Sequence, residues 1–383
     1  MSRTPLPRPT LLPGLPRIWR TPHTLQLGLD PPRAVLLDLP EPRAAGLLDL
    51  LDGSRSERLA LAEAATFGMR PDEARTLLDT LHTAGLVVPA QSLFPPAMPE
   101  RLTGEAAALA YSATTTSPAR TLRRRASARV VVTGRTRLAP AVAVALATAG
   151  IGHLHPDLTG PVEAHELPGS PLTPADLGHP RSQATASALR RAAPTTETRP
   201  VRRGAASLVI HLGEDHPTAL SAISHAHRRR PLLTASIREG KVLVGPLVPP
   251  STSPCLNCIT LHRRDREPTW PLDDPWSSPS GPFKAGSLLL ESASPDAGEV
   301  GSGIGPGRAG PAAVVPPEPC ATATLLAAVA YITAEALTFV DGNTPETLGA
   351  EVEISRPGTF RRRTWSPHPA CPCTRRSSLP RRP

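Results

Sequence analysis

The first regular pattern of hydrophobic and polar residues runs over residues 17–90. Polar and apolar residues alternate on both sides of Pro31 and Pro32, which predicts a β-hairpin with its turn at the prolines. Leucines then recur at helical spacing in residues 44–53 and 71–87, and a short apolar strand closes the segment. Residues 17–90 are therefore predicted to form a small α+β module of winged-helix type, a fold that binds DNA, peptides or partner proteins.

A second set of regular patterns starts at residue 128, after a stretch rich in Pro, Ala, Ser and Thr. The composition of that stretch predicts a disordered linker over residues 91–127. An apolar run at 128–134, a helical segment and a second apolar run ending at Asp157 then predict a βαβ unit. Further strands and helices continue to residue 265, which predicts a Rossmann-like domain with a parallel sheet.

One long segment of low complexity interrupts this domain. Residues 266–319 are rich in Pro, Gly and Ser and are predicted to form a flexible insertion. An Ala- and Leu-rich helix and a β-hairpin follow in residues 320–373 and complete the domain begun at 128–265, and residues 374–383 are predicted to be a disordered tail. The fold class is therefore α/β, with a winged-helix-like module followed by a Rossmann-like domain in two parts.

Composition narrows the partners that this chain is expected to have. The 383 residues carry a net charge of +9, which is typical of proteins that bind nucleic acid or membrane surfaces. Arginine supplies nearly all of this charge, since the only lysines are Lys241 and Lys284, and aromatic residues, which stack on bases, make up 3%. The sequence has no uninterrupted apolar run of about 18 residues and no signal-peptide pattern at its start. We therefore expect a cytoplasmic protein that binds neither membrane nor nucleic acid.

Four of the five cysteines form two close pairs, Cys255 with Cys258 and Cys371 with Cys373. In a reducing compartment such pairs indicate metal binding or catalysis rather than disulfides. Zinc takes four thiolates in tetrahedral geometry, and a short spacing lets one turn present two sulfurs to the same ion. We therefore predict one structural zinc ion on these four residues. Two alternatives remain open: a redox pair at Cys255 and Cys258, and His368 as a competing ligand.

The order of these features resembles the ThiF-type (ubiquitin-activating-enzyme-like) proteins. The match rests on the βαβ unit with Asp157 after its second strand and on the cysteine-bearing segments at 245–271 and 364–373. More narrowly, the chain resembles the actinobacterial partner proteins of cyclodehydratases in ribosomal peptide natural product pathways. The resemblance implies a Rossmann-like sheet with cysteine-bound zinc and a winged-helix clamp for the leader of a precursor peptide. It also implies two partners, a modifying enzyme of the same pathway and a second copy of the chain.

Active ThiF-type proteins adenylate a carboxylate with ATP, and the resemblance places the nucleotide site at Gly134, Arg135, Asp157 and Arg181. A glycine-rich turn lets backbone N–H groups approach the phosphates, an acid holds the ribose, and basic residues neutralise the triphosphate. Here one glycine of three remains in the turn, and the acids nearest the expected magnesium ligand stand at 214–215. These losses predict a vestigial site that uses neither ATP nor magnesium. The same residues also fit structural roles: a tight turn, a strand-end cap and a surface arginine.

Three functions fit the pattern. The first is a non-catalytic partner that binds a precursor peptide as an added strand near residues 25–37 and presents it to an enzyme such as an azoline-forming cyclodehydratase. The second is an active adenylyltransferase acting on a peptide or carrier-protein carboxylate. The third is a winged-helix DNA-binding regulator, which the acidic surface of the helix that starts at Pro71 and ends at Gly85 opposes. Cys320 is a candidate catalytic cysteine, although it also fits as a small residue capping a helix. We favour the first function, because the nucleotide turn is degenerate.

Overall fold

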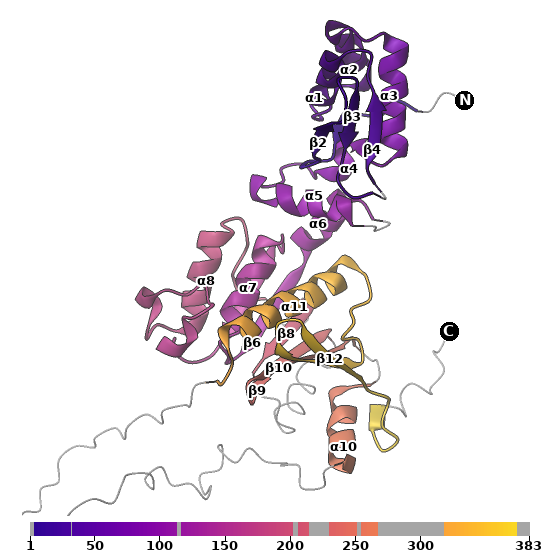
Figure 1. The fold of residues 1–383 in the computed structure, drawn as a ribbon. Coiled ribbons are helices and arrows are strands. Elements are labelled where there is room, and N and C mark those ends of the chain that lie inside the picture. Colours follow the sequence, from indigo (N-terminus) through magenta and orange to yellow (C-terminus); the bar gives the residue numbers. More distant parts are fainter. Residues whose placement is uncertain are drawn as a thin grey trace, which may run out of the picture.

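The computed structural model describes residues 4–31, 33–112, 116–201, 206–213, 230–250, 254–266 and 318–373. A small N-terminal module and a larger αβ domain lie in series, with a short helical segment between them (Figure 1). Three predicted segments fall wholly or mostly outside the described residues: a helix of the Rossmann-like domain expected at 216–230, most of the insertion at 266–319, and the tail at 374–383.

The N-terminal module is built on a three-stranded antiparallel sheet. The strand order is β2–β3–β4, so β3 is the central strand and β2 and β4 are the edges. The backbone N–H groups of Arg33 and Ala34 donate to the carbonyl of Asp30 and close the predicted hairpin turn between β3 and β4. The strands are β2 (Arg17–Trp19), β3 (Thr24–Leu27) and β4 (Val35–Asp38).

Helices and a second, two-stranded sheet complete this module. Helix α3 buries Ala74, Leu77, Leu78 and Leu81, as its periodicity predicts. Strand β1 pairs with β5 and lies ahead of residue 17, so the module begins earlier than the predicted boundary. The elements are β1 (Pro9–Leu11), the 3-10 helix η1 (Pro42–Gly46), α1 (Leu47–Leu50), α2 (Glu57–Glu63), the 3-10 helix η2 (Ala64–Phe67), α3 (Pro71–Thr83) and β5 (Val87–Pro89).

The prediction of a disordered linker at 91–127 is wrong for the described part of this segment. Helices α4, α5 and α6 occupy it, and Leu93, Ala106 and Leu122 form a small buried core between them. Its few large apolar residues fall where the helices meet, so the Pro-, Ala- and Ser-rich composition hid a packed element. The helices are α4 (Ala90–Leu93), α5 (Thr103–Tyr111) and α6 (Pro118–Ser127), with the 3-10 helix η3 (Glu100–Leu102) before α5.

A seven-stranded sheet forms the centre of the αβ domain. Its strand order is β12–β11–β10–β9–β8–β6–β7. Strands β7, β6, β8 and β9 run parallel, and β10, β11 and β12 continue the sheet in antiparallel pairing. The strands are β6 (Arg129–Gly134), β7 (His153–Leu158), β8 (Leu208–Leu212), β9 (Leu232–Arg238), β10 (Lys241–Val248), β11 (Ala350–Arg356) and β12 (Thr359–Thr364).

The predicted α/β class is confirmed, but the expectation of a parallel sheet holds only for the half around β6. Strands β9 and β10 are joined by Glu239 and Gly240, and β11 and β12 by Pro357 and Gly358. Connections this short join antiparallel neighbours, because parallel strands need a crossover of about a dozen residues or more. The two hairpins therefore make the sheet mixed.

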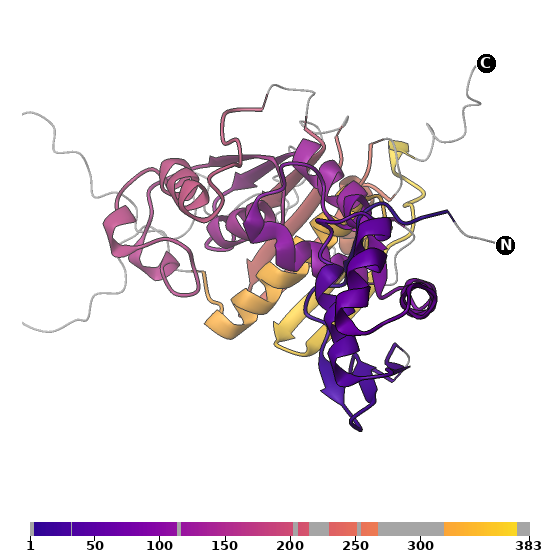
Figure 2. The same ribbon diagram turned by 90° about the horizontal axis from the view of Figure 1, so that it is seen from above.

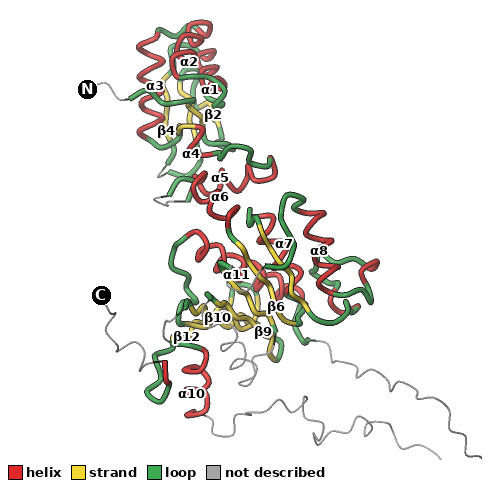
Figure 3. Tube along the Cα trace, turned by 180° about the vertical axis from the view of Figure 1, so that it is seen from behind, coloured by secondary structure: helices red, strands yellow, loops and turns green. Residues whose placement is uncertain are grey.

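Helices pack on both faces of this sheet. Helices α7, α8 and α11 group on one face, and α10 packs on the other, where Leu256 joins Val131, Val209 and Leu232 in a separate cluster (Figure 3). Seen from above, the N-terminal module lies at the end of the domain away from α8 (Figure 2). The helices are α7 (Ala139–Thr148), α8 (Arg181–Ala192), α10 (Leu256–Arg266) and α11 (Thr322–Asp341), with the 3-10 helices η4 (Ala164–Glu166) and η5 (Pro174–Asp176) between β7 and α8.

Among the described helices, α11 is long and apolar enough to cross a membrane by composition. In this fold it is a core helix, because Ala328, Ile332 and Ala336 are buried against the sheet. The carboxylate of Glu335, also buried, accepts hydrogen bonds from the backbone N–H and the hydroxyl of Thr347. The apolar character of α11 is therefore explained by the core that it completes.

Candidate functional site

The four paired cysteines meet at one point of the αβ domain. Cys255 and Cys258 lie at the start of α10, and Cys371 and Cys373 follow β12. The sulfurs of Cys255 and Cys371 lie 3.6 Å apart and those of Cys258 and Cys373 lie 3.3 Å apart, and all four are within 4.8 Å of one another. In a tetrahedral zinc site with Zn–S bonds of about 2.3 Å, the sulfurs are roughly 3.8 Å apart. The cluster therefore fits one tetrahedral metal ion.

The surroundings of the sulfurs are consistent with metal binding. Burial raises the pKa of the Cys255 thiol, because a buried thiolate is poorly solvated. Burial acts in the same direction at Cys371, but hydrogen bonds from the backbone of Cys373 and the amide of Asn257 lower the pKa of that thiol to about 7. A divalent ion would supply the missing positive charge and deprotonate the thiols. Four sulfurs leave no open coordination position, so an ion held here would be structural.

His368 lies beside the cysteines, but its ring nitrogens are engaged elsewhere. Its Nε2 lies 2.7 Å from a carboxylate oxygen of Asp265, and its Nδ1 accepts the backbone N–H of Ala370 at 3.1 Å. The ring therefore fixes the turn of the second cysteine pair instead of replacing a sulfur. His262 joins Asp265 and His368 in a second compact group of metal-ligand types, but its Nε2 is 3.0 Å from the carbonyl oxygen of Ser366.

A redox pair at Cys255 and Cys258 would be expected at a helix start after a strand, and the structure places the two residues in that setting. Helix α10 begins at Leu256, shortly after β10. The local fold therefore does not distinguish a redox pair from a metal site. Two other observations favour a metal site. A redox pair does not need a second pair of cysteine sulfurs beside it. Burial also raises the pKa of the Cys255 thiol, whereas reactive thiols have a lowered pKa.

The predicted nucleotide site lies at the carboxyl ends of β6 and β7, where Rossmann-like folds bind their ligands. Gly134 ends β6 with a φ of +111°, and a Cβ atom at this position would lie 1.9 Å from the carbonyl oxygen of Leu212 in β8. Glycine is required here because two strands approach closely. Gly134 therefore has a structural role whether or not the site holds a nucleotide.

The two arginines predicted to face a triphosphate are both paired with acids. Arg135 forms a half-exposed ion pair with Glu163 at 3.0 Å. Arg181 is buried, so its interpretation as a surface residue is wrong; its guanidinium makes a bidentate pair with Glu166 and donates to two backbone carbonyls. Asp157 is exposed at the end of β7. The structure thus leaves the predicted ribose acid accessible and engages both arginines with other partners.

An acidic residue that was not predicted from the sequence contacts the first turn. The carboxylate of Glu318 accepts the hydroxyl of Thr136 at 2.8 Å and the backbone N–H of Arg137 at 2.9 Å. Glu318 precedes α11 and lies more than 180 residues from its partners along the chain. Local periodicity and spacing cannot reveal a contact over that separation.

Cys320, the candidate catalytic cysteine, lies close to the same turn. Its backbone carbonyl accepts a hydrogen bond from the guanidinium of Arg137 at 3.2 Å. Burial raises the pKa of the Cys320 thiol, with Arg137 opposing the rise and Glu318 adding to it. A raised thiol pKa reduces the thiolate that thioester transfer needs. The environment of this cysteine therefore argues against catalysis.

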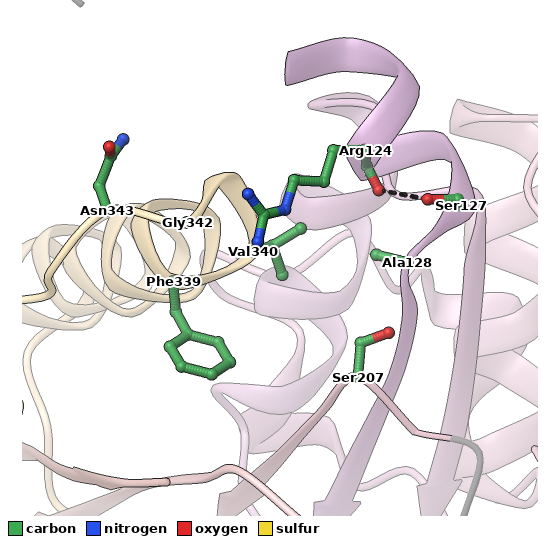
Figure 4. A pocket seen from close by; sticks show the side chains of 8 residues that line it. All are labelled: Arg124, Ser127, Ala128, Ser207, Phe339, Val340, Gly342 and Asn343. Atoms are coloured by element: carbon green, nitrogen blue, oxygen red, sulfur yellow. Dashed lines mark hydrogen bonds between the residues drawn. The ribbon is translucent and has the colours of Figure 1, made fainter. Parts of the chain in front are cut away.

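A cavity of about 420 Å³ lies at the opposite ends of the strands (Figure 4). Ala128 and Ser207, which precede β6 and β8, line it together with Gly342 at the end of α11. Arg124 also lines this cavity and donates to the backbone carbonyl of Asp341. Because Rossmann-like folds bind ligands at the carboxyl ends of their strands, this cavity is not the predicted nucleotide site.

The N-terminal module carries a groove of about 400 Å³ between β4 and α3. Strand β4 supplies one wall, on which the side chain of Leu36 is 62% exposed. Helix α3 supplies the other wall, with Leu77 and two acids, Asp72 and Glu73. Among the described strands β4 pairs with β3 alone, so the groove lies beside a sheet edge. A third acid, Asp38, ends that strand.

Comparison with known proteins identifies the fold through structure alone. No family model and no curated protein matches the sequence. Among solved structures, E. coli MccB with ATP is similar, with a TM-score of 0.58, 14% identity, and 95% of this chain and 99% of that chain covered. The microcin C7 biosynthetic enzyme MccB in complex with N-formylated MccA gives the same four values. PaaA is similar with a TM-score of 0.54, 15% identity, and 91% and 97% of the two chains covered.

These similarities cover the N-terminal module and the αβ domain together. The chain has the fold of MccB, a microcin C7 biosynthetic enzyme, and of PaaA. The resemblance seen in the sequence is confirmed at the level of fold alone. A shared fold does not by itself assign an activity, so the function has to be inferred from the sites.

Proposed function

We propose that this chain is a cytoplasmic partner protein that binds a precursor (leader) peptide and presents it to a modifying enzyme, such as an azoline-forming cyclodehydratase, without using ATP. The N-terminal module, of winged-helix type, is the peptide clamp. The αβ domain carries a structural zinc ion on its four clustered cysteines and docks the modifying enzyme. A second copy of the chain pairs with it through the Rossmann-like half.

The groove between β4 and α3 is the observation that carries peptide binding. A peptide that adds to a sheet edge gains main-chain hydrogen bonds, and its alternate side chains enter the space beside the strand. Leu36 and Leu77 offer apolar contacts on the two walls. The sequence placed the added strand near residues 25–37, and the edge strand in that range is β4, since β3 lies inside the sheet.

The charge of the groove narrows the kind of peptide that fits. Asp38, Asp72 and Glu73 line it, and none of its lining residues is basic. Arg70 pairs with Asp72 at the surface, which leaves the groove with a net negative charge. A leader with apolar residues at alternate positions and basic residues beside them fits this surface. DNA phosphates would be repelled, which disfavours a DNA-binding regulator.

The first turn of the αβ domain supports a function without ATP. Adenylation needs basic groups that neutralise the triphosphate and backbone donors that approach it. Arg181 is engaged by Glu166, and the N–H of Arg137 by the carboxylate of Glu318. MccB has been crystallised with ATP and with MccA. We propose peptide binding for this chain but not ATP binding, because the donors of its turn after β6 are occupied by the side chain of Glu318.

Peptide selection tests the proposal directly. Peptides of about 15 residues from a displayed random library would be selected on the full-length, zinc-loaded protein, and the affinity of an enriched peptide would be measured by fluorescence anisotropy. Leu36→Ser is expected to weaken binding by about tenfold or more, since truncating a hot-spot residue costs about 2 kcal/mol or more and each 1.4 kcal/mol is about tenfold.

Leu177→Ser is the matched control, because Leu177 is also exposed but lies in the αβ domain. It should leave the affinity unchanged. Selected peptides should also carry an excess of basic residues, and raised salt should weaken their binding. Equal affinities for Leu36→Ser and the unmodified chain would rule out the groove as the peptide site.

A further inference from the structure

The turn between β6 and α7 binds a carboxylate of the same chain, that of Glu318. One oxygen of the Glu318 carboxylate accepts two hydrogen bonds there, from the hydroxyl of Thr136 and the backbone N–H of Arg137. In doubly wound folds this position, a strand end followed by a helix N-terminus, is where phosphate groups bind. The Glu318 carboxylate therefore occupies the place of an oxyanion, with the kind of donors that a phosphate would use.

The buried charges around the turn balance only when Glu318 is included. Arg181 is neutralised by Glu166 through a bidentate pair. Arg137 is 8% exposed, and its guanidinium donates to two backbone carbonyls, while its Nε has no hydrogen-bond partner among the described residues. The acid that contacts its backbone is Glu318, which accepts the N–H of Arg137 and lies near enough for the two charges to attract. Removal of Glu318 would leave one positive charge buried beside open donors.

The partial burial of the Glu318 carboxylate supports its role as an anion held in a binding site. Burial raises the pKa of Glu318, the nearby Glu166 adds to the rise, and hydrogen bonds from Arg137 and Thr136 oppose it. An acid is placed in a poorly solvated position only where fixed donors hold it. The contact is therefore built into the turn and is not a chance approach of a surface side chain.

We propose that residues 134–138 form an anion-binding site whose resident anion is Glu318, and that this carboxylate keeps phosphate-type anions out of the turn. The segment before α11 then acts as a plug, which fastens α11 to the first turn and closes the nucleotide position. The inference rests on one part of the proposed function, the absence of ATP use, and is independent of peptide binding.

The proposal is tested by removing the Glu318 carboxylate from the turn in the full-length, zinc-loaded protein. Inorganic pyrophosphate is the probe, and its binding is measured by calorimetry to the unmodified chain and to Glu318→Ala. The unmodified chain should bind it at least tenfold more weakly than Glu318→Ala does. Adding Thr136→Val to Glu318→Ala should weaken binding again, because it removes one donor of the turn.

Glu353→Ala is the matched control. It also removes a paired acid, but Glu353 lies on β11 and pairs with the exposed Lys241, outside the turn, so pyrophosphate binding should stay as weak as in the unmodified chain. If Glu318→Ala is less stable, its melting temperature should rise with added pyrophosphate while that of the control does not, which keeps the test valid for a weakened fold.

Equal pyrophosphate binding by the unmodified chain and Glu318→Ala would overturn the plug. This failure is distinct from failure of the proposed function. If neither protein binds pyrophosphate or releases it from ATP, the plug is wrong and the partner function stands. If the unmodified chain itself turns over ATP, both are wrong, since the site then works with Glu318 in place.

Discussion

At the scale of single residues, the turn after β6 shows how far local sequence can be interpreted. A glycine after a buried strand predicts a tight turn, and Gly134 has that role because Leu212 of β8 lies against it. Arg181 and Glu318 gain their roles from partners elsewhere in the chain, Glu166 and Arg137. A pattern of neighbouring residues does not contain that information. The pairing of Arg181 and the contact of Glu318 were therefore not predicted, and the alternative interpretation of Arg181 as a surface residue is wrong.

Gly134→Ala should destabilise the fold severely. The new Cβ would lie 1.9 Å from the carbonyl oxygen of Leu212, and the φ of +111° is unfavourable for alanine. We expect a loss of more than about 3 kcal/mol in the free energy of unfolding, measured in urea. Gly178→Ala is the control, since Gly178 also has a positive φ but nothing within 4 Å of its Cβ position, and it should cost about 1 kcal/mol. Similar losses for the two variants would contradict the close strand approach.

At the scale of elements, strong periodicity gave correct predictions and composition alone gave a wrong one. The leucines of α3 repeat at helical spacing, and the four residues they place on one face are buried. The segment at 91–127 has too few large apolar residues to show such a repeat, yet its helices share the core formed by Leu93, Ala106 and Leu122. The charged end of α6 also falls in the segment predicted to be disordered, whereas Arg125 is buried and paired.

Arg125→Ala should show that this segment is a packed element. The guanidinium of Arg125 lies 2.7 Å from Asp341 at the end of α11 and 3.0 Å from Glu105 in α5, and its side chain is 5% exposed. Removing one partner of a buried ion pair costs about 3–5 kcal/mol, because the other charge stays buried. Lys241→Ala removes an exposed pair with Glu353 and should cost less than about 1 kcal/mol in the same urea measurement. A small loss for Arg125→Ala would indicate that α6 is not docked.

The four clustered cysteines predict that a zinc ion stabilises α10 and the turn that carries Cys371 and Cys373. We expect one zinc ion per chain by metal analysis, and we expect a chelator to lower the melting temperature, because the ion would join α10 to the chain after β12. Cys258→Ser should lose the ion, while Cys320→Ser, which changes the cysteine outside the cluster, should retain it. Retention of zinc by Cys258→Ser, or no metal in the unmodified chain, would rule out the site.

At the scale of the whole molecule, the N-terminal module with its β4–α3 groove and the αβ domain are joined by packed helices. Besides Arg125, the guanidinium of Arg101 donates to the backbone carbonyls of Ala147 and Thr148 at the end of α7. The sequence predicted the two bodies but not this connection, because its contacts span long stretches of chain. A peptide in the groove would therefore be held in a fixed direction relative to the αβ domain, as presentation to a docked enzyme requires (Figure 1).

ATP–pyrophosphate exchange by the full-length, zinc-loaded protein with its selected peptide bound is the measurement that tests the central claim most directly. An adenylating enzyme returns label from pyrophosphate to ATP, because formation of the adenylate is reversible. We predict no exchange above the level without protein, although the peptide is bound at the β4–α3 groove. Exchange that depends on both the peptide and magnesium would contradict a presenting partner and show that the site at Gly134, Asp157 and Arg181 still adenylates.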